Sequence, residues 1–155
     1  MKMNILVTGG LGYIGSLVVL RLIDIGCSPI VIDNLSNSKK VTHHRIEKIS
    51  KKNLYLYEGS ILDRSLLNKI FHDNKIDTVM HFAGLKSVHE SYLYPIKYYQ
   101  NNAIGTIELI SAMRKNGTRS IIFSSSATVY GEPESLPIKE GHSLNPTNVY
   151  GKTNL

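Results

Sequence analysis

The chain has 155 residues, 42% hydrophobic and 19% charged, with a formal net charge of +6. This length and composition favour one globular domain with a buried core and exclude a disordered or low-complexity chain. The longest apolar runs, such as residues 17–20, are far shorter than the roughly 20 residues of a membrane span. The N-terminus lacks a signal-peptide pattern and the single Cys27 excludes an internal disulfide, so we expect a cytoplasmic protein without a membrane partner.

The first elements in chain order predict a βαβ unit. Residues 4–7 form an apolar, strand-like run, and the segment TGGLGYIG, residues 8–15, follows it. Residues 17, 20, 21 and 24 then have helical spacing up to Gly26. A second β-branched run, PIVID at residues 29–33, completes a unit of about 30 residues.

The same alternation continues along the chain. We expect a helix around residues 42–50, a strand at 54–58, a helix at 63–73 with Asp63 as its N-cap, and a strand at 78–82. A longer helix over 95–115 and a strand at 120–124 follow; residues 127–149 are irregular, and another helix begins near Tyr150. Alternating strands and helices predict an α/β fold, a doubly wound parallel Rossmann sheet of about five strands.

The glycine-rich turn is the first functional motif. Gly9, Gly12 and Gly15 directly follow a strand and open a helix, which allows the backbone to approach a pyrophosphate at the helix N-terminus. Asp33 ends the second strand 18 residues after Gly15, where a carboxylate accepts hydrogen bonds from ribose hydroxyls and repels a 2′-phosphate. Together they predict a dinucleotide cofactor, NAD rather than NADP.

Two later strand ends meet the same edge of such a sheet. Ligands of doubly wound folds bind outside the carboxyl ends of the strands, so residues 82–86 (FAGLK) and the serines Ser124 to Ser126 belong to the expected cleft. Lys86 follows two small residues at a strand end, and we interpret it as a cofactor contact.

The basic and histidine-rich segment suggests no further ligand. Much of the positive charge lies in residues 39–52, but without interleaved aromatic residues it is more typical of a solvated helix face than of a nucleic-acid site. His43 and His44 are adjacent rather than spaced i,i+4, and the other histidines are scattered. We therefore expect neither a nucleic-acid partner nor a metal.

Five segments carry a specific resemblance: TGGLGYIG, HFAGLKSVHES, YYQNNAIGT, SSSATVYGE and YGKT. They resemble, in order and spacing, the extended short-chain dehydrogenase/reductase family, also called the NAD-dependent epimerase/dehydratase family, in its UDP-glucose 4-epimerase branch. The resemblance covers the whole chain but only about the first half of such an enzyme. It implies that residues 1–155 are a Rossmann NAD-binding domain, incomplete at its C-terminal end, without the substrate-binding domain.

The resemblance also implies site residues by position. The cofactor contacts would be, in chain order, Gly9, Gly12, Tyr13, Ile14, Gly15, Asp33, Asn34, Leu35, Ser36, Asn37, Ser38, Ser60, Ile61, Phe82, Ala83, Gly84, Lys86, Asn101 and Ser124. The catalytic hydroxyls would be Ser126 and Tyr150, which with Lys86 would also contact the substrate.

The implied reaction interconverts UDP-glucose and UDP-galactose in galactose metabolism. Tyr150, as phenolate, would take the proton from the sugar 4-hydroxyl while a hydride passes to NAD, and the 4-keto sugar would turn over and receive the hydride on its other face. The family's partners are a UDP-sugar and a second copy of the chain.

Two residues depart from the family pattern. The reference pKa of tyrosine is about 10, and a lysine four residues on, at about 4 Å, would favour the phenolate by on the order of 4 kcal/mol. Asn154 stands at that position, and Lys152 points elsewhere because residues two apart do not share a helix face. Ser60 replaces the usual aspartate at the adenine, which predicts weaker adenine recognition.

Two other interpretations stay open. One is a related nucleotide-sugar epimerase or dehydratase, although a dehydratase would have acidic residues after its catalytic serine or threonine and Ala127 and Thr128 are not acidic. The other is a non-catalytic NAD-binding remnant. In a titration with NAD alongside an epimerase assay, binding without turnover would support the remnant over an active enzyme.

Overall fold

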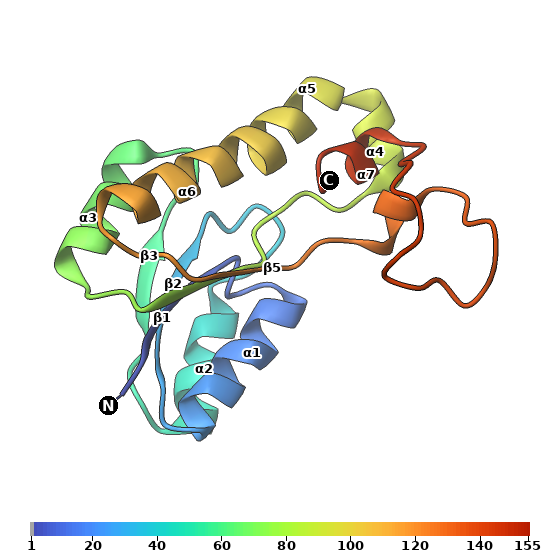
Figure 1. Cartoon of the computed structure of the whole chain (residues 1–155). Coiled ribbons are helices and arrows are strands. Elements are labelled where there is room, and N and C mark those ends of the chain that lie inside the picture. The colour runs from blue at the N-terminus through green and yellow to red at the C-terminus, as the bar shows by residue number, and fades with distance from the viewer. Residues whose placement is uncertain (1) are drawn as a thin grey trace. The chain divides into compact units, whose positions relative to one another are not determined.

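The structure is a computed structural model that describes residues 2–155. A parallel sheet flanked by helices forms most of it (Figure 1). The strands are β1 (Asn4–Thr8), β2 (Ser28–Asp33), β3 (Tyr55–Glu58), β4 (Thr78–His81) and β5 (Ile121–Phe123). The helices are α1 (Tyr13–Asp24), α2 (Val41–Ser50), α3 (Arg64–Asp73), α4 (Val88–Leu93), α5 (Pro95–Tyr98), α6 (Gly105–Lys115) and α7 (Val149–Lys152).

The described chain divides into two units. The sheet unit comprises the described residues up to Ala83 and the segment Ile107–Ser124, and therefore holds all five strands named above. The tyrosine unit comprises Gly84–Thr106 and Ser125–Leu155.

The strand order is β3-β2-β1-β4-β5, and every pair is parallel. β1 is central, with Val7 opposite Val31 of β2 on one side and Met80 of β4 on the other. The chain fills one half of the sheet outward from β1 and then returns to fill the other half. The order thus reverses between β1 and β4, which confirms the predicted doubly wound sheet and creates its switch point.

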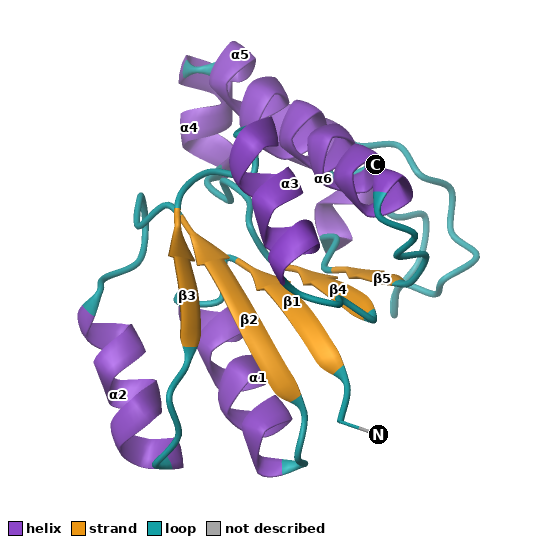
Figure 2. Cartoon of the chain, turned by 90° about the vertical axis from the view of Figure 1, so that its left-hand side faces the viewer, coloured by secondary structure: helices purple, strands orange, loops and turns teal. Residues whose placement is uncertain are grey.

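Side-chain alternation along the strands builds a core on each face of the sheet. Leu6 and Ile30 pack with α3 and α6 residues such as Leu67 and Leu109, whereas Val7 of β1 packs against α1 and α2. Figure 2 shows α3 and α6 on one face and α1 and α2 on the other. Because successive strand residues point to opposite faces, strands that are apolar at every position require helices on both sides.

The predicted boundaries hold well for α3. It begins after Asp63, whose side chain accepts a hydrogen bond of 2.9 Å from the Leu66 N–H, as expected for an N-cap. The preceding loop closes with a bond of 3.0 Å from the Asp63 N–H to the Ser60 carbonyl oxygen.

The predicted helix over residues 95–115 is confirmed in its bounds, but it is not α-helical throughout. The structure has α5, then a π-helical turn at Tyr99–Ile104, then α6. The buried Asn102 lies in this turn, and its side chain hydrogen bonds to the Leu85 backbone. A helical periodicity in the sequence cannot reveal such a turn, because the side-chain pattern of the flanking helices continues through it.

Helix α4 was not predicted from the sequence, although a local signal exists. The Ser87 hydroxyl accepts a hydrogen bond of 3.1 Å from the Glu90 N–H, and the spacing Ser-x-x-Glu is that of a capping box. Pro95 at the first position of α5 separates the two helices. None of the helices in the described residues is long and apolar enough to cross a membrane.

Candidate functional site

The glycine turn between β1 and α1 tolerates no Cβ at its first and last glycines. Gly9 has φ +66°, and a Cβ there would lie 2.8 Å from the Ala83 nitrogen. A Cβ on Gly15 would lie 2.2 Å from the Gly9 carbonyl oxygen, whereas one on Gly12 would be 3.3 Å from that oxygen. The three predicted glycines therefore allow a sharp turn that lies close to the segment after β4.

The N-terminus of α1 is open at this turn. The helix begins at Tyr13, its N-cap Gly12 has no side chain to accept from the first amides, and the first turn contains no acidic residue. Tyr13 is 85% exposed. Unbonded N–H groups and the positive end of the helix dipole together form a site for an anion such as a phosphate.

Asp33, at the end of β2, is buried at 8% exposure beside this turn. Its Oδ2 accepts a hydrogen bond of 2.9 Å from the Leu11 N–H, and its Oδ1 accepts from the Leu35 N–H at 2.9 Å and from the Ser38 hydroxyl at 2.8 Å. The carboxylate thus joins the glycine turn to the loop after β2. This is a structural task that its sequence position did not predict.

A hollow of about 450 Å³ lies along the N-terminal end of α1 and the α2 segment. Its lining includes Gly12, Tyr13, Ser38, Lys39 and Arg45. Hydroxyl, amide and cationic groups at the open end of a helix suit a polar, negatively charged ligand. Of the predicted ribose segment, Asn37 and Ser38 line this hollow, and the Asn34 side chain accepts from the Ser36 N–H at 3.1 Å.

Thr8 connects the ends of β1 and β4, which sequence reasoning missed. Its hydroxyl oxygen accepts a hydrogen bond of 3.2 Å from the Ala83 N–H. The same hydroxyl is hydrogen-bonded to Nδ1 of His81, and the side chains of Thr8 and His81 are both buried. Burial lowers the pKa of His81 to about 4, so the ring is neutral near pH 7. Ser124 continues the next strand, where its N–H donates to the His81 carbonyl oxygen at 3.1 Å.

Two residues expected near an adenine differ in placement. The Ser60 hydroxyl accepts a hydrogen bond of 3.2 Å from the Leu62 N–H in the turn before α3. Ile61 is only 4% exposed and packs in the core with Leu67 and Ile70. The Ile61 side chain therefore contributes to packing under this loop.

In the tyrosine unit, Tyr150 is the second residue of the short helix α7, which packs on the turn that follows Ser126. Asn148 caps α7 by accepting from the Gly151 N–H at 2.7 Å, and a Cβ on Gly151 would lie 2.7 Å from the Thr128 carbonyl oxygen. The Ser126 oxygen accepts from both the N–H and the hydroxyl of Thr128, at 3.3 and 2.9 Å. The two predicted hydroxyl residues thus lie on elements in direct backbone contact.

Asn154 does not extend along the helix face toward the Tyr150 phenol. Its side-chain nitrogen, Nδ2, donates a hydrogen bond of 2.7 Å to the Tyr150 backbone carbonyl, and the Thr153 hydroxyl donates to the same oxygen at 2.8 Å. The side chain at the expected lysine position therefore satisfies a carbonyl at the end of α7. It supplies no charge.

Asn102, adjacent to the predicted Asn101, holds this unit together. Its Oδ1 accepts from the Leu85 N–H at 2.8 Å, and its Nδ2 donates to the Leu85 carbonyl at 3.0 Å and to the Thr153 hydroxyl at 3.1 Å. Asn101 donates to the Asn102 side chain at 2.9 Å, and Lys86 is exposed. The loop after Gly84 is thereby fixed to α7.

A buried tyrosine lies edge-on to Tyr150. The ring centroids of Tyr98 and Tyr150 are 6.5 Å apart at an interplanar angle of 83°. The Tyr98 hydroxyl donates to Glu90 and accepts from the Ser87 N–H, each at 2.9 Å, and Lys97 binds the other Glu90 oxygen at 2.7 Å. Burial, with the Glu90 bond, raises the pKa of Tyr98 to about 12, and the Lys97 bond lowers the pKa of Glu90. Sequence reasoning did not identify this network.

Comparisons with known proteins identify the family of the chain. A family model described as GDP-mannose 4,6 dehydratase matches residues 6–155. The UDP-glucose 4-epimerase of Bacillus subtilis (strain 168) is 51% identical over 153 residues, which cover 99% of this chain and 45% of that protein. The chain therefore spans about half the length of such relatives.

Solved structures show the same likeness. The UDP-glucose 4-epimerase from Bifidobacterium longum, in complex with NAD+ and UDP, matches with a TM-score of 0.96 and 44% identity over 98% of this chain and 46% of that one. The enzyme from Stenotrophomonas maltophila, with NAD and formylated UDP-arabinopyranose, matches at 0.96 and 39%, over 99% and 46%. The chain belongs to the family that the GDP-mannose 4,6 dehydratase model describes, the epimerases and dehydratases of the extended short-chain dehydrogenase/reductases.

Proposed function

We propose that this chain is the NAD-binding part of a UDP-glucose 4-epimerase, an isomerase that interconverts UDP-glucose and UDP-galactose through a 4-keto sugar. The observation that carries the proposal is the glycine turn at the start of α1. The Leu11 N–H in this turn donates a hydrogen bond to Asp33, and the N-terminus of α1 has no side-chain cap. Relatives of that name at 51% and 44% identity support the same function.

The residues of the sheet unit fit NAD. The Cβ-free turn at Gly9, Gly12 and Gly15 leaves the α1 amides accessible to a pyrophosphate. Asp33 uses three of its roughly four acceptor positions within the chain, which leaves one for a ribose hydroxyl. Its charge opposes an added 2′-phosphate, so we propose NAD rather than NADP as the cofactor.

The tyrosine unit would supply the proton chemistry. NAD, when bound, accepts a hydride from the sugar carbon and returns it. The Ser126 oxygen already accepts two hydrogen bonds from Thr128, so its own proton is left to donate to a sugar oxygen. Tyr150 would accept the proton of the sugar hydroxyl. The roles of Lys86, Asn101 and the other expected contact residues stay predictions.

Isothermal titration of the chain with NAD and NADP tests the cofactor proposal. We expect saturable binding of NAD and at least tenfold weaker binding of NADP, on the order of the energy of one charged hydrogen bond. Gly12→Val, which places a side chain over the first amides of α1, should abolish NAD binding. Gly141→Val is the matched control, because nothing lies within 4 Å of a Cβ at Gly141. Absence of NAD binding by the unaltered chain would contradict the proposal.

Conversion of UDP-galactose tests the catalytic part. The assay uses the chain joined to the C-terminal part of the Bacillus subtilis relative, with Asn154 or with Asn154→Lys. A base that gains a positioned cation should accelerate conversion by roughly 100-fold or more. Equal conversion by both forms would show that position 154 does not activate the tyrosine.

One observation favours a second candidate function, NAD binding without turnover. The neutral Asn154 amide is held by the Tyr150 carbonyl, so α7 is complete without a cation. Under this alternative the chain binds NAD, but the fusion to the C-terminal part of the Bacillus subtilis relative does not convert UDP-galactose, either with Asn154 or with Asn154→Lys. The homodimer of the family is a separate prediction, tested by light scattering after size exclusion.

A further inference from the structure

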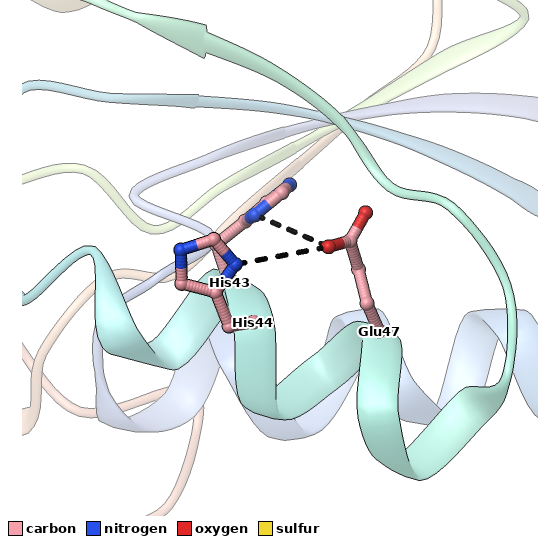
Figure 3. A group of neighbouring side chains, drawn as sticks. All are labelled: His43, His44 and Glu47. Carbon is pink, nitrogen blue, oxygen red and sulfur yellow. Dashed lines mark ion pairs between the residues drawn. The ribbon is translucent and has the colours of Figure 1, made fainter.

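A cluster of possible metal ligands lies on α2, and the proposed function does not use it. His43, His44 and Glu47 each direct one ligand atom toward the others, and these atoms lie within 4.8 Å of one another. Figure 3 shows both imidazole rings on the side of the helix that carries the Glu47 carboxylate. From sequence spacing we expected no metal, because the two histidines are adjacent. Glu47 is the missing partner, four residues after His43 and three after His44, and therefore on the same helix face.

The distances are close to those of a coordinated cation. His43 Nδ1 lies 3.6 Å and His44 Nδ1 4.0 Å from the same Glu47 oxygen, Oε2. Metal bonds of 2.0 to 2.1 Å place neighbouring ligand atoms of a tetrahedral site roughly 3.4 Å apart. The His43 pair needs almost no adjustment. The His44 side chain is 70% exposed, so it is free to rotate by the small amount that would shorten the 4.0 Å between its Nδ1 and Glu47 Oε2.

The backbone of Leu54 orients two of the three ligands. Nε2 of His43 lies 3.0 Å from the Leu54 carbonyl oxygen, which can only accept, so the proton is on Nε2 and the lone pair of Nδ1 points to the cluster. The Leu54 N–H donates to Glu47 Oε1 at 3.1 Å, which turns Oε2 toward the imidazoles. Metal-binding histidines in proteins usually donate their second N–H to such a carbonyl, which fixes the ring and its tautomer.

Burial and charge indicate which cation would fit. The side chains of His43 and Glu47 are 14% and 30% exposed, so two ligands are held in place while the side near His44 is open for a water molecule. Glu47 is the only acidic residue of α2, which also carries Arg45 and Lys48. A single carboxylate in basic surroundings is a poor site for Mg²⁺ or Ca²⁺, which need several oxygen ligands, whereas two imidazoles suit Zn²⁺ and its transition-metal neighbours.

We propose that His43, His44 and Glu47 form a binding site for one divalent transition-metal cation such as Zn²⁺, with water completing the coordination. The three ligands come from one helix, and the Leu54 backbone holds two of them. A bound cation would therefore tie α2 to the segment that enters β3. The site does not depend on NAD and is independent of the proposed function.

Calorimetric titration of the full chain with ZnCl₂, without NAD, tests the site. We expect saturable binding of one Zn²⁺ per chain and no comparable binding of Mg²⁺. His44→Gln and Glu47→Gln should each weaken Zn²⁺ binding by at least about tenfold, since even residues that only orient a ligand are worth roughly 10- to 100-fold in metal affinity. His72→Gln is the matched control, because His72 is an exposed histidine beside a single carboxylate, Asp73, and should bind Zn²⁺ like the unaltered chain.

Visible absorption of the Co²⁺-loaded chain gives a second readout. Four-coordinate Co²⁺ bound by these residues should give an intense visible band that disappears in His44→Gln. Because the His44 side chain is 70% exposed, we expect His44→Gln to fold like the unaltered chain, so this variant is decisive even if Glu47→Gln is destabilised. The proposal is overturned if the chain shows no saturable Zn²⁺ binding, if Mg²⁺ binds equally well, or if His44→Gln retains the affinity of the unaltered chain.

Discussion

The glycine turn of the sheet unit and the Tyr150 segment of the tyrosine unit carry their expected roles by different physical means. At the turn, the function depends on the backbone and on missing Cβ atoms, and Gly9 and Gly15 meet that demand. At Tyr150, the expected role depends on a positive charge one helical turn away. Asn154 does not meet that demand, and its amide bonds to a backbone carbonyl.

Binding geometry and proton chemistry therefore place separate demands on the sequence. A pyrophosphate cradle is built from backbone amides and needs only space. A tyrosine base needs electrostatic stabilisation of its phenolate, because its reference pKa is about 10. Substitutions and changes of pH that remove individual interactions test whether each region depends on them.

Gly15→Ala should have the largest effect on stability. The new Cβ would meet the Gly9 carbonyl oxygen at 2.2 Å, and neither backbone can move without opening the turn. We expect the free energy of unfolding to fall by about 3 kcal/mol, the upper range for overpacking, with loss of NAD binding. Urea denaturation measures the change, with Gly141→Ala as the control that should stay within about 0.5 kcal/mol. A stability equal to that of the control would show that the turn is not sterically determined.

Acidification should destabilise the sheet unit through His81. Its pKa is about 4 when folded, against 6.5 for the ordinary residue, so the unfolded chain binds the extra proton between these values. The neutral ring's contribution is complete above pH 6.5 and is lost as the pH falls toward 4, in total about 3 kcal/mol.

Urea denaturation at a series of pH values measures this loss. In His81→Gln the loss between pH 6.5 and 4 should be smaller by about the same amount, and in the exposed His72→Gln it should be unchanged. Identical slopes in His81→Gln and the unaltered chain would show that His81 does not titrate in this range.

Asp33→Asn should weaken the link between the glycine turn and the loop after β2. One oxygen of the carboxylate becomes an NH₂ group, so either the Leu11 N–H or the pair of Leu35 and Ser38 loses its acceptor. We expect a loss of about 2 kcal/mol, the cost of a buried donor without a partner. Thermal and urea denaturation measure it. Asn34→Ala, which removes a single exposed bond to the Ser36 N–H, is the control.

Tyr98→Phe should have the smallest effect and lies in the tyrosine unit. It removes the hydroxyl that donates to Glu90 and accepts from the Ser87 N–H, but the ring keeps its edge-on packing against Tyr150. We expect a loss of about 1 kcal/mol in unfolding free energy. Tyr92→Phe, at an exposed tyrosine with one long hydrogen bond of 3.5 Å, should be neutral. A larger loss in Tyr92→Phe than in Tyr98→Phe would contradict the importance of the buried network.

The sequence was sufficient for the doubly wound sheet and for the residues of the glycine turn. Runs such as PIVID and the helical spacing before Gly26 are local signals, and TGGLGYIG has few backbone solutions after a strand. Asp63 as an N-cap was equally local, because the side chain bonds to an amide three residues away. Such features depend on interactions within one turn or one strand.

Hydrogen bonds between polar groups far apart in the sequence became visible in the folded structure alone. Asn102 bonds to Leu85, 17 residues earlier in sequence, and to Thr153, 51 residues later, and a π-helical turn surrounds it. The Leu54 backbone, outside α2, orients His43 and Glu47 toward a common point. Hydrogen bonds have a fixed reach and direction, so their partners depend on where the packed elements place the backbone, and periodicity in the sequence does not record that placement.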